Sequence, residues 1–110
     1  YVAWDGDKIV ATAAVRAYDK DYEIFKGVYS KDDTASIWRL MVDEDYRRHG
    51  LARNLVDVME DFARKKSYDK MYLHTHRYLD AALSFWKSLG YEVTVEEDDY
   101  DETSHMIKNL

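Results

Sequence analysis

Two short apolar runs on either side of one amphipathic stretch constrain the fold of this chain more than any other feature of its 110 residues. Residues 37–42 (IWRLMV) form a run of strand length, and residues 70–76 (KMYLHTH) form a second. Between them, apolar residues recur at helical spacing: Leu51, Leu55, Val58, Met59, Phe62 and Ala63. A strand–helix–strand unit closes as a right-handed crossover between parallel strands. We therefore expect a central parallel strand pair and expect residues 37–42 to be buried on both faces.

Strand patterns also precede and follow this unit. Residues 2–4 and 8–17 flank a glycine-containing turn, which predicts a β-hairpin, and residues 19–36 read as a surface loop. A second amphipathic helix follows residue 76 and ends near Gly90. The alternation after Gly90 and the last seven residues predict a closing hairpin. The predicted fold class is α/β (α+β): one domain over residues 1–110, with a mixed, mainly antiparallel sheet, a central parallel strand pair and flanking helices.

Composition excludes several classes of protein. An apolar content of 46% and an aromatic content of 15% are enough to fill a core, so a disordered or fibrous chain is not expected. The absence of cysteine excludes disulfides, cysteine-based zinc sites and thiol nucleophiles, and no metal site is expected. No apolar stretch approaches the ~20 residues of a membrane span, which predicts a soluble, cytoplasmic protein. Because Tyr1 already lies in strand-like sequence, we expect the chain to derive from a longer protein.

The negative charge of the chain is concentrated in one segment. The net charge is −6, and residues 92–102 contain seven acidic side chains and no lysine or arginine. An acidic protein repels phosphates, so a nucleic-acid partner is not expected. The acidic segment is either a solvated loop or a surface that attracts a cationic substrate.

The segment with the clearest chemistry joins residues 37–42 to the long helix. Its sequence, DYRRHGLAR at 45–53, places small residues where main-chain amides at a helix start can approach an anion. The nearby side chains of Arg47, Arg48, His49 and Arg53 strengthen that preference. The letters match neither G-x-G-x-x-G nor the Walker loop. The segment is therefore an anion cradle of pyrophosphate size, or a tight turn with incidental arginines.

This segment resembles a known motif. Residues 47–52, RRHGLA, match the Arg/Gln-x-x-Gly-x-Gly/Ala motif of the GNAT superfamily of N-acetyltransferases, which bind acetyl-CoA. Further blocks lie at the family's spacings and extend the resemblance over about residues 36–95: residues 40–42, 62–63, Tyr68, residues 73–75, and Ala82 with Trp86 ahead of residues 90–91. The strand and turn motifs look like the branch that includes cysteine-conjugate N-acetyltransferases and N-acetylaspartate synthases.

The resemblance implies a co-substrate site. Acetyl-CoA would be held by Met41, Val42, Arg47, Arg48, His49, Gly50, Leu51, Ala52, Arg53 and Trp86. Amides of residues 48–53 would bind the pyrophosphate, and the main chain of Met41 and Val42 would pair with the pantetheine arm. The two central strands would splay apart around the thioester, an amine would attack it directly, and an amide near Val42 would stabilise the oxyanion.

The catalytic groups depart from the family's pattern. Trp86 stands where many relatives carry a tyrosine that serves as the acid, and Leu79 stands where an asparagine is common. We expect His74 and His76 as candidates for the base, because histidine titrates near neutral pH, and Tyr91 and Tyr78 as candidates for the acid. The plainer interpretation of both histidines is that they are surface residues of a strand.

The resemblance predicts transfer of an acetyl group from acetyl-CoA to a primary amine of a small molecule or peptide, and the acidic segment favours a cationic acceptor. The alternatives are a non-catalytic CoA-binding or interaction domain and an enzyme for longer acyl chains. The chain starts after the strand and two helices that usually precede the hairpin in this family. Their absence would leave an unpaired edge that invites homodimerisation or aggregation.

Overall fold

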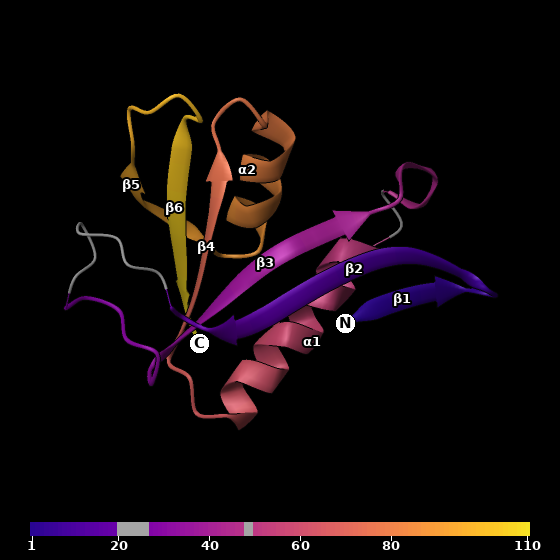
Figure 1. The fold of residues 1–110 in the computed structure, drawn as a ribbon, viewed down its shortest axis with the longest axis horizontal. Helices are drawn as coiled ribbons and strands as arrows, with labels where there is room; N and C mark the ends of the chain where they lie inside the picture. The colour runs from indigo at the N-terminus through magenta and orange to yellow at the C-terminus, as the bar shows by residue number, and fades with distance from the viewer. Residues whose placement is uncertain (20–26, 48–49) are drawn as a thin grey trace.

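The computed structural model describes residues 1–19, 27–47 and 50–110, and places them in one six-stranded sheet with two α-helices (Figure 1). In chain order the elements are β1 (Val2–Asp5), β2 (Lys8–Ala17), β3 (Thr34–Val42), the 3-10 helix η2 (Glu44–Tyr46), α1 (Leu51–Lys65), β4 (Lys70–His76), α2 (Asp80–Ser88), β5 (Glu92–Glu96) and β6 (Thr103–Asn109). The strand order is β1-β2-β3-β4-β6-β5, and β3 runs parallel to β4 while the other neighbours are antiparallel. The predicted fold class and order of elements are confirmed.

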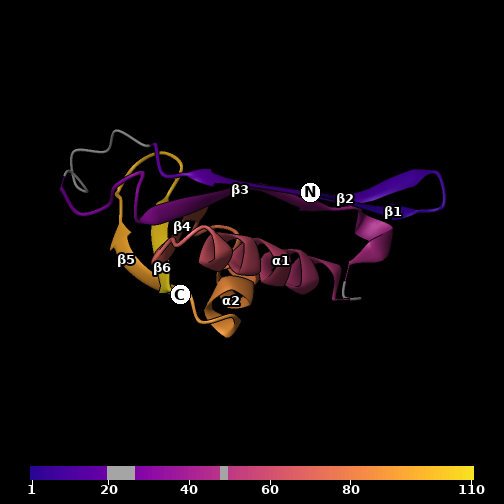
Figure 2. The ribbon, with the colours of Figure 1, turned by 90° about the horizontal axis from the view of Figure 1, so that it is seen from below.

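Both helices cover the same face of the sheet (Figure 2). We call this the inner face and the opposite one the outer face. The main core lies on the inner face, where Val56 and Met59 of α1 and Trp86 of α2 pack with Ala35, Met71 and Met106 of the strands. A smaller cluster on the outer face joins Tyr18 and Tyr72. No helix in the described part of the chain is both long and apolar enough to span a membrane.

Strand β3 differs from the sequence prediction in its start and in the burial of its second half. It begins at Thr34, three residues before the predicted start, and Thr34 and Ser36 are buried although they are polar. The expectation that residues 37–42 are buried on both faces is wrong, because Met41 is 67% exposed. The cause is the short parallel pairing, in which Thr34, Ala35 and Ser36 pair with Lys70, Met71 and Tyr72. Beyond Ser36, no strand within the described residues pairs with that edge of β3.

Two irregularities in strand pairing change the direction of side chains in the first hairpin. Val10 and Ala11 are both buried, although neighbouring residues of a regular strand point to opposite faces, because the register of β1 against β2 shifts beside them. The second shift separates the pair Thr12–Met41 from the pair Ala14–Trp38, and it places an extra residue in β3. Such bulges re-aim the side chains of a strand, so the sequence period of two does not assign faces here.

The part of the acidic segment that follows Glu96 forms the loop of the closing hairpin, while its first residues form β5, and Asp99 organises the loop. The Asp99 carboxylate accepts hydrogen bonds of 2.9 Å from both the backbone amide and the hydroxyl of Thr103. The hydrogen bond from the amide is the main reason that the pKa of Asp99 lies below its usual value. The loop is therefore tied to the start of β6 by a carboxylate in its charged form.

This loop contact is expected to be sensitive to acid. A lowered pKa in the folded state stabilises the loop above the unfolded pKa of about 3.9, and the contribution is lost as the pH falls through the folded value. We expect hydrogen-exchange protection of the Thr103 amide, corrected for the intrinsic rate, to fall as the pH drops below about 4. Asp99→Asn should abolish this pH dependence and Asp98→Asn should retain it. An unchanged profile in Asp99→Asn would contradict the assignment.

Candidate active site

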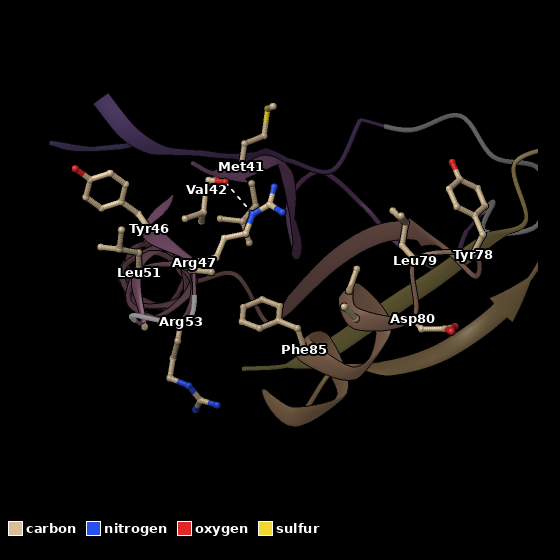
Figure 3. Close-up of a pocket in the computed structure, with 15 residues that line it drawn as sticks. Met41, Val42, Tyr46, Arg47, Leu51, Arg53, Tyr78, Leu79, Asp80 and Phe85 are labelled. Carbon is tan, nitrogen blue, oxygen red and sulfur yellow. Dashed lines mark hydrogen bonds between the residues drawn. The ribbon is translucent and has the colours of Figure 1, made fainter. Parts of the chain in front are cut away.

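A cavity of about 890 Å³ opens where β3 diverges from β4. Seven of the ten predicted co-substrate residues line it: Met41, Val42, Arg47, Gly50, Leu51, Ala52 and Arg53. Its other walls come from Leu40, from Tyr46, and from the segment that begins α2, namely Tyr78, Leu79, Asp80, Ala81, Ala82 and Phe85 (Figure 3). The cavity therefore joins the end of β3 and the start of α1 to the start of α2.

The β3 side of the cavity presents an unpaired strand edge. β2 pairs with one edge of β3 up to Val42, while the pairing with β4 stops at Ser36. In Figure 3 the Arg47 side chain lies at the end of this strand, where its Nε donates a hydrogen bond of 3.2 Å to the Val42 carbonyl. An extended arm with amide groups fits this edge as an added strand would. The hydrogen bond holds a positive charge at the end of that edge.

The start of α1 has the features of an anion site. Gly50 is the N-cap residue with a φ of 80°, a left-handed conformation that favours glycine, and it has no side chain that could cap the helix. The first turn of α1 contains no acidic residue. The first amide groups of a helix have no partner within the helix, and the helix dipole adds positive potential there. Arg48 and His49 lie outside the described residues.

Contacts with the first hairpin fix the segment that leads into this turn. The Tyr46 hydroxyl donates a 2.5 Å hydrogen bond to the Asp5 carboxylate, and this bond is the main reason that the pKa of Tyr46 is raised. Lys8 forms an ion pair with Asp43 at 3.4 Å. The Asp43 carboxylate in turn accepts a hydrogen bond from the Asp45 amide. These contacts bind the turn between β1 and β2 to the segment between β3 and α1.

His74 and His76 lie together on the outer face of β4. Their ring centroids are 6.2 Å apart, and the His74 side chain is exposed. The Nδ1 of His76 lies 2.8 Å from the Asp101 carbonyl oxygen, and its ring stacks on Tyr78 at 5.3 Å. Tyr78 is 59% exposed and lines the cavity. The structure thus brings His76 and Tyr78 together at the α2 end of the cavity and leaves His74 accessible beside the diverging strands.

Trp86 and Tyr91 are not brought to the cavity. Both are buried, with their ring centroids 5.2 Å apart, and Phe85 is the aromatic residue of α2 that lines the cavity. The Tyr91 hydroxyl donates a 2.8 Å hydrogen bond to Glu60. Burial, reinforced by the Glu60 charge, raises the pKa of Tyr91 far above its usual value. Neither the predicted co-substrate contact by Trp86 nor the predicted acid role of Tyr91 agrees with this placement, because one helical position separates the core face of α2 from its cavity face.

Sequence reasoning did not find a polar network beside His74. His105 of β6 pairs with His74 across the sheet and is fully buried. Its Nδ1 lies 2.6 Å from the Tyr72 hydroxyl, and its Nε2 lies 3.0 Å from a carboxylate oxygen of Glu97. The network joins residues more than 30 positions apart through the pairing of β4 with β6. No local motif in the sequence signals it.

Comparisons with known proteins agree with this geometry. A model described as the Acetyltransferase (GNAT) family matches residues 1–91. The chain is similar to probable N-acetyltransferase 14 of Xenopus tropicalis, with 31% identity over 86 residues that cover 66% of this chain and 42% of that protein. It is also similar to the ribosomal protein bS18-alanine N-acetyltransferase of Escherichia coli K12, with 32% identity over 72 residues that cover 64% of this chain and 49% of that protein.

Among solved structures, Arabidopsis thaliana Naa50 in complex with the bisubstrate analogue CoA-Ac-MVNAL has a similar fold. The TM-score is 0.80 at 23% identity, and the match covers 99% of this chain and 71% of that one. The chain spans about half the length of the curated relatives named above. The match of the family model over most of the chain, together with the six-stranded sheet and its diverging parallel pair, shows that the chain belongs to the acetyltransferase (GNAT) family.

Proposed function

We propose that this chain binds acetyl-CoA in the cavity and transfers the acetyl group to a primary amine, which attacks it directly in a ternary complex. One observation carries the proposal: the unpaired edge of β3 and the start of α1 border the same cavity of about 890 Å³. A strand edge can hold the amides of an extended arm, and a helix start can hold a pyrophosphate. The two are side by side, as acetyl-CoA requires.

Different residues of the chain would hold different parts of acetyl-CoA. The amides at the start of α1, from Gly50 to Arg53, would face the pyrophosphate, with Arg47, Arg48, His49 and Arg53 adding positive charge. The main chain of Met41 and Val42 would pair with the pantetheine arm. Apolar side chains of the cavity wall, including Leu40, Leu79 and Phe85, would pack against that arm. When bound, acetyl-CoA supplies the thioester carbonyl that the amine attacks.

His74 is the proposed general base. Alkyl amines have pKa values near 10 and are protonated at neutral pH, so a base must remove a proton before attack. His74 is exposed on the outer face, two positions beyond the last parallel pair of β3 with β4. His76 is the second candidate, and its Nδ1 lies 2.8 Å from the Asp101 carbonyl oxygen. Tyr78, which lines the cavity with an exposed ring, is the proposed source of a proton for the departing thiolate.

The acceptor is proposed to be a primary amine of a small molecule or of a peptide end. The contact between His76 and Asp101 brings the acidic loop next to the proposed base, which supports attraction of a protonated amine. The similarity of residues 39–42, 50–52 and 73–75 to the branch with cysteine-conjugate N-acetyltransferases and N-acetylaspartate synthases supports a small acceptor.

Substitution of Gly50 tests the co-substrate site. Gly50→Glu places a carboxylate at the helix start, where it should repel the pyrophosphate, and we expect the affinity for acetyl-CoA and free CoA to fall at least about tenfold by calorimetric titration. Gly27→Glu is a matched control, because Gly27 has a φ of 79° against 80° for Gly50 and both have open space around the added side chain. The control should bind normally.

The outcomes separate the alternatives. Equal affinity of both variants and the unaltered chain would contradict the placement of the pyrophosphate. Tight binding without acetylation of any primary amine in a broad panel would instead favour a non-catalytic CoA-binding domain.

A further inference from the structure

Two arginines flank one tryptophan on the outer face of β2 and β3. The guanidinium carbons of Arg16 and Arg39 each lie 4.6 Å from the centroid of the Trp38 ring. Ile37 belongs to the core on the inner face, so its neighbour Trp38 faces outward, opposite Ala14 of β2. We call Arg16, Trp38 and Arg39 the arginine cluster.

Arg39 has a strained backbone conformation in this cluster. Arg39 has a φ of 56°, a left-handed conformation that is uncommon for residues other than glycine. It lies in the bulge between the pairs Thr12–Met41 and Ala14–Trp38. Bulges re-aim side chains and occur often beside active sites, where backbone strain is tolerated. As a result Arg39 stacks on its neighbour Trp38, while Leu40 packs against the core.

The arginine cluster borders the same opening as the proposed base. The parallel pairing of β3 with β4 ends at Ser36 and Tyr72. Trp38 lies two residues beyond Ser36 on β3, and His74 lies two residues beyond Tyr72 on β4. Both side chains are therefore on the outer face. The cluster and His74 therefore lie on the same face of the sheet, one on each of the two diverging strands.

The donors of this cluster are suited to a carboxylate. A guanidinium stacked on an aromatic ring keeps its N–H groups at its edge, where they can bind a carboxylate through two hydrogen bonds. Arg16 forms an ion pair with Asp19 at 3.4 Å, whereas Arg39 forms no ion pair with any described residue. The indole Nε1 of Trp38 is buried and has no hydrogen-bond partner within the described part of the chain. The exposed guanidinium of Arg39 thus lies against a ring whose buried N–H has no partner among the described residues.

We propose that the arginine cluster, with Arg39 as its main donor, binds a carboxylate of the acceptor, so that the preferred acceptors are amino acids or similar small zwitterions. This inference rests on the proposed function and specifies its substrate class. The amine end would lie toward His74 and the acidic loop, and the carboxylate end toward Arg39. Opposite charges on the two sides of the opening would then orient the acceptor with its amine toward the thioester.

The test compares acceptors that differ by one carboxylate. A panel of α-amino acids is assayed with acetyl-CoA beside the amines that lack only the carboxylate, such as leucine beside isopentylamine. We expect the unaltered chain to favour the amino acid of its best pair at least about tenfold in kcat/KM, mainly through KM, as loss of a charged hydrogen bond predicts. Arg39→Gln should bring this ratio close to one, and Arg39→Lys should keep part of it.

Lys65→Gln is the control, because it removes one positive charge from an exposed position at the end of α1. It should keep the ratio of the unaltered chain. A ratio near one in the unaltered chain, or the same ratio in Arg39→Gln, would overturn the inference while the proposed function stands.

A second readout does not need turnover. If no amine is acetylated, the proposed function fails, and the indole N–H resonance of Trp38 is followed by NMR while α-amino acids are added. A saturable shift in the unaltered chain that is absent in Arg39→Gln would support the carboxylate site. No shift in the unaltered chain would overturn it.

Discussion

Replacement of Glu60 by alanine is expected to lower the free energy of unfolding by about 3 kcal/mol. Glu60 is 3% exposed on α1 and accepts hydrogen bonds from Lys108 at 2.9 Å and from Tyr91 at 2.8 Å. Arg64 lies 3.6 Å from the same carboxylate. Loss of the carboxylate leaves the buried Tyr91 hydroxyl and the half-buried Lys108 ammonium without their acceptor. Breaking a buried charge pair by removing one partner costs about 3–5 kcal/mol, and partial exposure of Lys108 reduces that figure.

Asp61→Ala is the matched control for this prediction. Asp61 is the next residue of the same helix and also contacts Arg64, at 3.4 Å, but its side chain is 68% exposed. An exposed ion pair contributes less than about 1 kcal/mol. Urea denaturation of both variants measures the difference. If the free energies of unfolding of Glu60→Ala and Asp61→Ala differ by less than about 1 kcal/mol, Glu60 does not join α1 to β6 and to the residue before β5 as described.

Replacement of His74 by alanine is expected to lower kcat by about 10²–10⁴-fold, the usual contribution of a general base. The affinity for acetyl-CoA should not change, because His74 lies outside the residues that line the cavity. The activity of the unaltered chain should fall at acid pH, as an imidazole that must be neutral takes up a proton. In His74→Ala this acidic limb should disappear.

His76→Ala is the companion variant, and steady-state kinetics over a range of pH compares the two. Because Nδ1 of His76 is held by the Asp101 carbonyl, its loss should disturb the acidic loop and raise KM for the acceptor more than it lowers kcat. A kcat within about threefold of normal in His74→Ala would contradict its role as base. If His76→Ala alone lost the acidic limb, the base would be His76.

The sequence predicts those helices and strands whose apolar pattern is contained within the element itself. The period of α1 and the boundaries of β4 at residues 70–76 agree with the structure, because a helix and a buried strand each leave a repeating apolar pattern. The start of β3 was missed because Thr34 and Ser36 are polar and read as part of a loop. Their burial depends on β4, which pairs with them from more than 30 residues away.

In the candidate site, too, sequence predicts the residues that lie close together in the chain and misses those whose position depends on tertiary packing. The cavity residues from Leu40 to Arg53 are nearly continuous in the chain, so one motif could identify them. Phe85 was missed in favour of Trp86, because the sequence does not fix the rotation of a short helix against a sheet with the accuracy of one residue. The arginine cluster depends on a bulge at Arg39, and sequence periodicity gives no sign of an extra residue in a strand.

The measurement that tests the central claim most directly follows the acetyl group. The chain is incubated with acetyl-CoA labelled in the acetyl group and with a panel of primary amines that includes amino acids and peptides. We predict label in an N-acetylated amine, release of one CoA for each product, and none of the label on the chain. Label retained by the chain in the absence of an amine would contradict direct transfer. A chain that binds acetyl-CoA but labels no amine would contradict the proposed activity.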